Sequence, residues 1–151
     1  MIETMQDAYS AVTDFNSLAG NLENVTDDSI DNQIDFIFEE LCETITAFED
    51  NNRVELLDGC ADLFVTVAGL MKKLEAQGYN VAEAIARVNE NNLSKFSKRV
   101  TYADSSNPDY VITLNEKHGR YVIKDKVTGK VRKPSDFVSV CLDDLVPEEV
   151  A

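Results

Sequence analysis

Six of the eight acidic residues in the otherwise apolar stretch "IFEELCETITAFEDNNRVELLDGCADLFVTV", in the middle of the chain, are candidates for chemistry. They are Glu39, Glu40, Glu43, Glu55, Asp58 and Asp62. Carboxylate oxygens are hard ligands, and a group of them without histidine is typical of sites for Mg²⁺ or Mn²⁺. The residue types therefore predict a divalent-metal site that uses Mg²⁺, with Mn²⁺ as the alternative ion.

The spacing of these acids predicts that they share helix faces. At about 100° per residue, Glu55, Asp58 and Asp62 fall within an arc of roughly 60°. The other residues of that helix are apolar almost all round, which predicts a buried helix. Unpaired carboxylates in such a place cost several kcal/mol each unless a cation neutralises them. The alternative is that the acids line a wet crevice or pair with lysines from elsewhere in the chain.

Residues 1–100 show the apolar periodicity of helices. We predict helices over about 5–18, 30–49, 53–77 and 81–97, with Asp27, Asp28 and Ser29 as N-cap candidates for the second. Phe15 is assigned to the core, and Cys42 and Cys60 to buried, free thiols in a reducing cytoplasm. One helical unit of this size is too small to cover so apolar a third helix, so a homodimer or a higher homo-oligomer is expected.

The chain changes character after residue 100. "DYVITLNEKHGRYVIKDKVTGKVRKP" alternates at period two, with turn residues at "KHG" and "TG", and predicts a hairpin or a three-strand meander. It follows the expected linker "ADSSNPD" and precedes the acidic tail "LDDLVPEEVA", which we expect to be loosely held. The predicted fold is all-α: a four-helix domain over 1–100 and a small β-rich extension with the tail over 101–151.

The charge of the chain restricts its partners. Twenty-eight acidic residues against fourteen lysines and arginines give a net charge of −14, which argues against binding nucleic acid. No apolar run is long enough to span a membrane, and no secretory signal begins the sequence, so we expect a soluble, cytoplasmic protein. His118, the single histidine, excludes histidine-rich zinc sites and most nucleophile systems that need an imidazole.

Two acidic motifs in order resemble the all-α nucleoside triphosphate pyrophosphohydrolases. These are the MazG-like enzymes, with relatives among dimeric dUTPases and phosphoribosyl-ATP pyrophosphohydrolases. The motifs are EExxE, at Glu39, Glu40 and Glu43, and ExxD, met by "ELLD" at 55–58. In a second register, Asp62 takes the place of the ExxD aspartate. The resemblance implies that Glu40, Glu43, Asp58 and Asp62 bind metal, with Glu39 and Glu55 supporting them or binding a further ion.

A third segment, "VNENNLSKF" at 88–96, is similar to one in phage-encoded members of the family, as is the β-rich tail with "TGKVRKP". The likeness implies that Asn92 and Lys95 reach the nucleotide phosphates. Asn89 stands where those members have a histidine, and Asn16 matches another such position near the sugar and base. The plainer alternatives are that Lys95 is a solvated lysine at a helix end and that Asn92 terminates the helix.

The resemblance implies a Mg²⁺-dependent enzyme that cleaves a nucleoside triphosphate or dNTP to the monophosphate and pyrophosphate. Among the glutamates, Glu39 is the preferred general base. It also suggests phage origin, and with it a place in the host cytoplasm. Two alternatives remain open: a phosphohydrolase acting on an alarmone or a phosphoribosyl nucleotide, and a non-catalytic helical interaction protein with a structural cation site.

Overall fold

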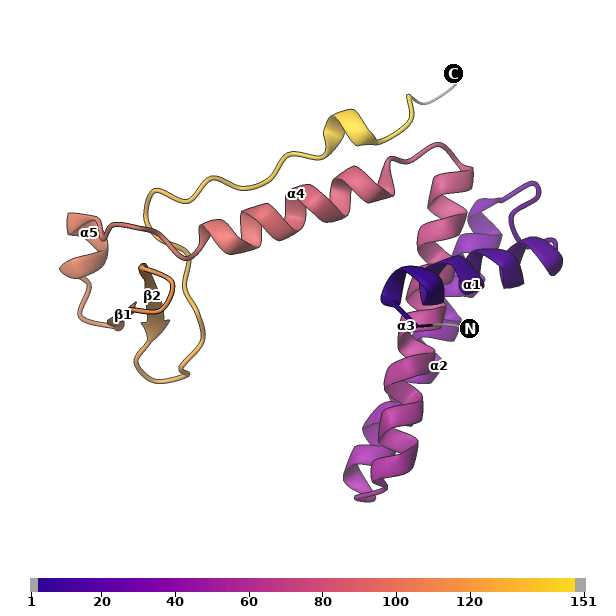
Figure 1. Ribbon diagram of the computed structural model, residues 1–151, viewed down its shortest axis with the longest axis horizontal. Coiled ribbons are helices and arrows are strands. Elements are labelled where there is room, and N and C mark those ends of the chain that lie inside the picture. The colour runs from indigo at the N-terminus through magenta and orange to yellow at the C-terminus, as the bar shows by residue number, and fades with distance from the viewer. Residues whose placement is uncertain (1–2, 149–151) are drawn as a thin grey trace. The chain divides into compact units, whose positions relative to one another are not determined.

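The computed structural model describes residues 3–148 (Figure 1). The elements in chain order are α1 (Met5–Leu18), α2 (Asp27–Glu49), α3 (Arg53–Ala76), α4 (Val81–Ser94), α5 (Tyr102–Ser105), β1 (Tyr110–Asn115), β2 (Arg120–Asp125) and the 3₁₀ helix η1 (Asp143–Leu145). The prediction of a mainly helical chain with four main helices and a C-terminal antiparallel hairpin is confirmed. The chain forms two compact units, one of residues 1–81 with 146–151 and one of residues 82–145.

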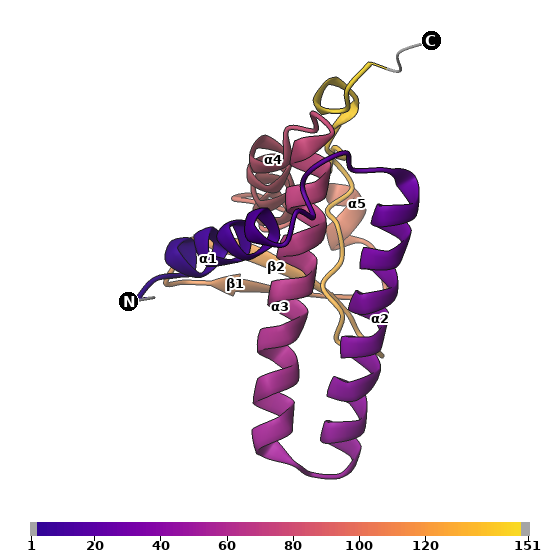
Figure 2. The same ribbon diagram turned by 90° about the vertical axis from the view of Figure 1, so that its right-hand side faces the viewer.

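In the first unit, α2 and α3 form an antiparallel helical hairpin (Figure 2), and α1 packs on α3. Thr26 caps α2 in a reciprocal pair with Ser29, so the three predicted N-cap residues are instead its first turn. Asn51 has a positive φ of 55° and Asn52 accepts a hydrogen bond from Glu55 N. These two residues reverse the chain between the long helices.

Small residues let α2 and α3 approach closely. A methyl group on Gly59 would lie 2.5 Å from Thr44 Oγ1, and one on Gly69 would lie 3.1 Å from Gln33 Nε2. Buried polar side chains fix the pairing further: Gln33 Nε2 donates to Thr66 O at 3.0 Å, and Lys73 Nζ donates to Ser29 O at 2.7 Å. The two helices therefore have one defined register.

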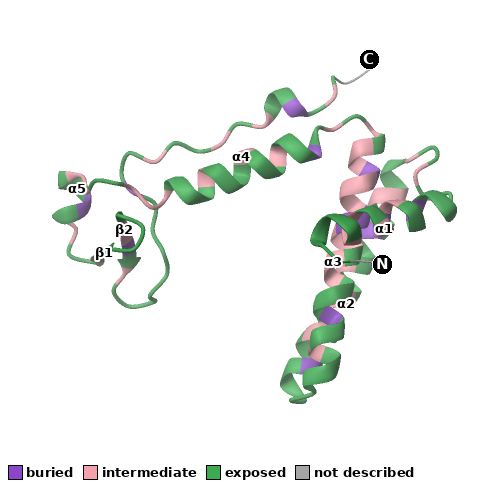
Figure 3. Cartoon of the chain, in the orientation of Figure 1, coloured by how far each residue is buried: buried purple, intermediate pink, exposed green. Residues whose placement is uncertain are grey.

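The acid-bearing half of this hairpin is not buried, which contradicts the prediction for the third helix. Leu57 is 74% exposed and Phe15 is 65% exposed, so the assignment of Phe15 to the core is wrong. Cys42, Cys60 and Cys141 are free but exposed, so the prediction of buried thiols is wrong as well. Among the described residues, α2 and α1 are the elements that pack most extensively on α3, and much of the acid-bearing half of the hairpin is exposed (Figure 3).

In the second unit, β1 and β2 pair in antiparallel register from Tyr110 opposite Asp125 to Asn115 opposite Arg120. Ile123, 2% exposed, is the apolar centre of this unit. The outer edge of β2 is also paired, because Tyr121 N donates to Ser97 O at 2.8 Å and Arg132 N donates to Ile123 O at 2.8 Å. α4 ends three residues earlier than predicted, and α5 occupies part of the expected linker.

The acidic tail is held more firmly than predicted. Both terminal nitrogens of the Arg87 guanidinium donate to the Asp144 carboxylate, at 2.7 and 2.8 Å, and Arg87 Nε donates to Glu83 at 2.8 Å. Leu145 is buried beside this pair. Residues 149–151 of the tail lie outside the described residues. No helix in the described part of the chain is long and apolar enough to cross a membrane.

Candidate metal site

The register of α2 and α3 determines which acids face each other. Gln33 lies against Gly69, and Glu40 is seven residues further along α2 while Asp62 is seven residues back along α3. Seven residues are about two helical turns, so both steps return to the same face. Glu40 and Asp62 therefore come opposite each other across the hairpin.

The electrostatics of Glu40 confirm this placement. Partial burial raises the pKa of its carboxyl, and the negative charges of Asp62, Glu43, Glu39 and Asp58 raise it further. Asp62, on the facing helix, is the largest of the charge effects. No lysine or arginine is among the causes of this shift, although an adjacent cation would oppose it. Four of the predicted acids therefore act on Glu40, and no basic side chain offsets their effect on its pKa.

Glu40 is half-buried, whereas the other acids of the group, Glu39, Glu43, Asp58 and Asp62, are exposed. Within residues 3–148, no three histidine, cysteine or acidic side chains converge closely enough to hold an ion. The donor set nevertheless fits Mg²⁺ chemically, because it consists of hard carboxylate oxygens from two facing helices.

Glu55 is the acid that the structure does not bring into this group. It lies in the first turn of α3, where its backbone N–H is capped by Asn52, and it is not among the groups that shift the pKa of Glu40. Two of the three basic residues of α3 lie at its C-terminal end, away from the acids, and have partners there. Lys72 forms an ion pair with Glu75 at 2.7 Å, and Lys73 Nζ donates a hydrogen bond to Ser29 O.

The predicted nucleotide-binding residues differ in availability. Asn16 is 5% exposed, and its side chain is used within the first unit, donating to Val12 O and accepting from Asn21. Asn92 and Lys95 bond each other at 2.7 Å at the end of α4, and Asn89 is exposed on that helix. Asn16 thus supports the end of α1, whereas Asn89, Asn92 and Lys95 belong to the second unit.

An apolar groove of about 660 Å³ runs between α1 and α3. Phe15 and Val12 line it from α1, and Leu57, Phe64 and Val65 line it from α3. The helical periodicity of both segments was visible in the sequence, but it could not tell a groove between two helices from a filled core. The groove lies at the same level of α3 as Asp62, because its lining residue Ala61 directly precedes Asp62, but about 100° round the helix from it.

Acids opposed across two antiparallel helices are the architecture on which helical proteins build carboxylate metal sites. The chain belongs to the phosphoribosyl-ATP pyrophosphohydrolase family, whose family model matches residues 17–92. This match includes α2 and α3 with all six acidic residues, and it confirms the resemblance seen in the sequence. Membership implies a pyrophosphohydrolase. No curated protein and no solved structure matches the chain.

Proposed function

We propose that the protein is a Mg²⁺-dependent pyrophosphohydrolase that cleaves a nucleoside triphosphate or dNTP to the monophosphate and pyrophosphate. The observation that carries this proposal is the opposed pair Glu40 and Asp62, in which neighbouring carboxylates raise the pKa of a half-buried glutamate. An unneutralised group of acids on a helix pair attracts a divalent cation, and the family to which the chain belongs acts on a phosphoanhydride.

In this proposal Glu40, Glu43, Asp58 and Asp62 hold the ion, and Glu55 supports them from the start of α3. Bound Mg²⁺ supplies charge for the phosphate oxygens and activates water. Glu39 takes the proton of the attacking water as its oxygen bonds to phosphorus and the bridging P–O bond of the α–β anhydride breaks. Asn92 and Lys95 bind the phosphates, with Asn89 nearer the sugar and base, whereas the buried Asn16 supports the end of α1. The helical domain of 1–100 carries this chemistry.

A homodimer is part of the proposal. Large apolar side chains are exposed along both helices of the hairpin; they are Ile34, Phe36, Phe38, Leu41, Ile45, Phe48, Val54, Leu57 and Val65. Exposed apolar side chains in this number favour a contact with another protein, and a second copy presents the same residues in a two-fold arrangement. Such a contact would give α3 the burial that its sequence predicts.

The test is to incubate the protein with each NTP and dNTP plus Mg²⁺ and identify the products by anion-exchange chromatography. The expected products are a nucleoside monophosphate and pyrophosphate in equal amounts, with no turnover in excess EDTA. Diphosphate and orthophosphate as products, or no turnover of any nucleotide despite tight Mn²⁺ binding, would contradict the proposal. The second of these results would favour a structural cation site.

A second candidate substrate is phosphoribosyl-ATP, because the matching family carries that name. The same carboxylates would serve, since the bond cleaved is again a phosphoanhydride. Parallel assays with phosphoribosyl-ATP and the dNTPs, compared by kcat/KM, decide between the two. An alarmone included in the same panel tests the remaining alternative.

A further inference from the structure

Positive charge is concentrated in one part of the second unit. Residues 95–133 contain ten of the fourteen lysines and arginines, together with His118, but only four of the 28 acidic residues. This segment has a formal charge of +6, whereas the rest of the chain has −20. The net charge of −14 conceals this segregation, so an argument from net charge alone does not exclude an anionic ligand here.

The segment also contains a cavity of about 500 Å³, a size in the range of small-ligand sites. Leu93, Phe96 and Val122 form an apolar wall, and Asn115, His118 and Arg120 line it with polar groups. The cross-strand register explains the arrangement, because Asn115 pairs with Arg120 and Val122 lies on the same face as Arg120. The end of α4 and one face of the hairpin thus combine an aromatic and aliphatic wall with two nitrogen-rich side chains.

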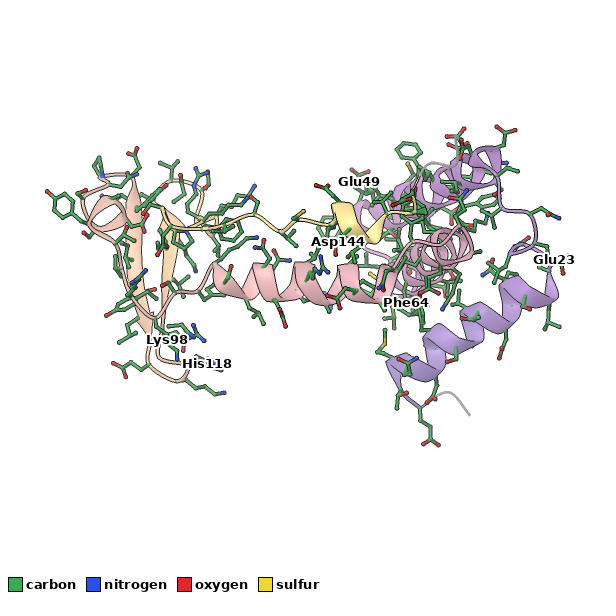
Figure 4. All side chains as sticks on the ribbon, turned by 90° about the horizontal axis from the view of Figure 1, so that it is seen from above. Glu23, Glu49, Phe64, Lys98, His118 and Asp144 are labelled. Carbon is green, nitrogen blue, oxygen red and sulfur yellow. The ribbon has the colours of Figure 1, made fainter. Side chains whose placement is uncertain are left out.

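The basic groups at this cavity are not used by acids. Arg120 forms no ion pair within residues 3–148; one of its nitrogens donates to Phe96 O at a long 3.4 Å. Elsewhere in the segment, Arg99 and Arg132 do pair with aspartates. Figure 4 shows Lys98 and His118 at the tip of the hairpin. The basic charge at the cavity therefore remains available to an external anion.

We propose that this cavity is a second ligand site, distinct from the carboxylates, that binds a nucleoside phosphate without metal. The base lies against Phe96, Leu93 and Val122, and the phosphate accepts hydrogen bonds from Arg120 and His118. A flat apolar body joined to an anion satisfies both halves of the cavity, whereas phosphate alone leaves the apolar wall uncovered and a nucleoside gives the Arg120 guanidinium no anion to bind. The family supplies nucleotides as the relevant ligand class.

The test is calorimetric titration of the full chain in EDTA with dAMP, deoxyadenosine and inorganic phosphate. EDTA removes the divalent ions that the carboxylate group needs, so binding then reports the cavity. We expect dAMP to bind at least about tenfold more tightly than either fragment, and Arg120→Gln or His118→Gln to weaken it about tenfold. Lys130→Gln is the matched control, because Lys130 is basic, exposed and outside the cavity.

Each outcome has a separate meaning. No binding of dAMP in EDTA, or equal loss in Lys130→Gln and Arg120→Gln, overturns the site. So does a single-stranded oligonucleotide that binds far more tightly than dAMP, which indicates nucleic acid instead. Persistence of dAMP binding in Glu43→Gln supports the site. Because the readout needs neither metal nor turnover, it is independent of whether the carboxylates catalyse pyrophosphate release.

Discussion

The helical hairpin of α2 and α3 and the C-terminal unit of residues 82–145 treat charge in opposite ways. On the helical hairpin, neighbouring carboxylates raise the pKa of Glu40, and no basic side chain offsets this effect. In the C-terminal unit, Asp125 pairs with Arg132 at 2.6 Å and Asp144 with Arg87 at 2.7 Å, and these arginines hold the pKa of both aspartates below the ordinary range.

The C-terminal unit thus pairs these aspartates within the chain, whereas under the proposed function a metal ion neutralises the acids of the helical hairpin. The apolar residues divide in the same way. Ile123 fills the centre of the C-terminal unit, whereas Leu57 and Phe48 project from the helical hairpin at 74% and 69% exposure. The proposed metal ion and the proposed second copy of the chain both address this one region, the first its charge and the second its exposed apolar side chains.

The largest expected effect comes from removing one carboxylate of the helical hairpin. Glu43→Gln keeps the size of the side chain but removes a proposed ligand, so we expect pyrophosphate release with Mg²⁺ to fall by about 100-fold or more. Initial rates under saturating Mg²⁺ and nucleotide measure this. Glu49→Gln, on the same helix but outside the group, is the control; equal activity in both variants would remove Glu43 from the site.

The next effect concerns the apolar surface. Leu57→Asp places a charge on an exposed apolar face of α3, and we expect it to shift the protein from dimer to monomer in analytical ultracentrifugation. Val127→Asp is the counterpart in the C-terminal unit, where Val127 is 94% exposed, and it should leave the mass unchanged. A monomeric wild-type protein at all concentrations tested would refute the shared interface.

A smaller effect is expected where the two long helices touch. Gly59→Ala places a methyl group 2.5 Å from Thr44 Oγ1 and 3.3 Å from Thr44 Cα, so the helices must separate. Overpacking should lower the free energy of unfolding by about 1–3 kcal/mol, offset by up to about 1 kcal/mol of helix propensity. Urea denaturation measures this loss, and adding Thr44→Ala to Gly59→Ala should recover part of it. A Gly59→Ala variant as stable as wild type would mean that α2 and α3 are further apart at Gly59 than described.

The smallest effect is the response to acid, which should differ in sign between the two regions. The pKa of Glu40 is raised above its ordinary 4.5, so in metal-free protein its contribution to stability is complete below 4.5 and is lost as the pH rises through the folded-state pKa. The pKa of Asp125 is lowered below 3.8, so its contribution is present above 3.8 and lost on further acidification.

Denaturation midpoints measured across this pH range, in EDTA, check both signs. Glu40→Gln should flatten the dependence above pH 4.5, and Asp125→Asn should flatten it below pH 3.8. A Glu40→Gln variant whose profile matches wild type throughout would show that the carboxylates do not interact as described.

Periodicity was enough to predict the four main helices, because each has a regular apolar stripe, and alternation with turn glycines was enough for the β1–β2 hairpin. The EExxE and ExxD spacing led to the family. Periodicity could not predict which helix faces are exposed, because an apolar helix has the same sequence pattern whether its own chain or another chain covers it. That is why Phe15, Cys42 and Cys60 were misplaced.

The candidate site was predictable as a set of residues but not as a geometry. That Glu40 faces Asp62 depends on the contacts of Gly59 with Thr44 and Gly69 with Gln33, which join residues far apart in the chain. The basic segment of 95–133 was equally visible in the sequence, but the net charge of the whole chain does not reveal where the positive charge lies.

Binding of Mn²⁺ followed by electron paramagnetic resonance tests the central claim most directly, because the signal of free Mn²⁺ is lost when protein ligands bind it. We predict saturable depletion by wild-type protein, strongly weakened in Glu40→Gln and in Asp62→Asn and unchanged in Glu49→Gln. Undiminished free Mn²⁺ in the presence of wild-type protein, or binding that none of the three substitutions alters, would contradict a metal site between α2 and α3.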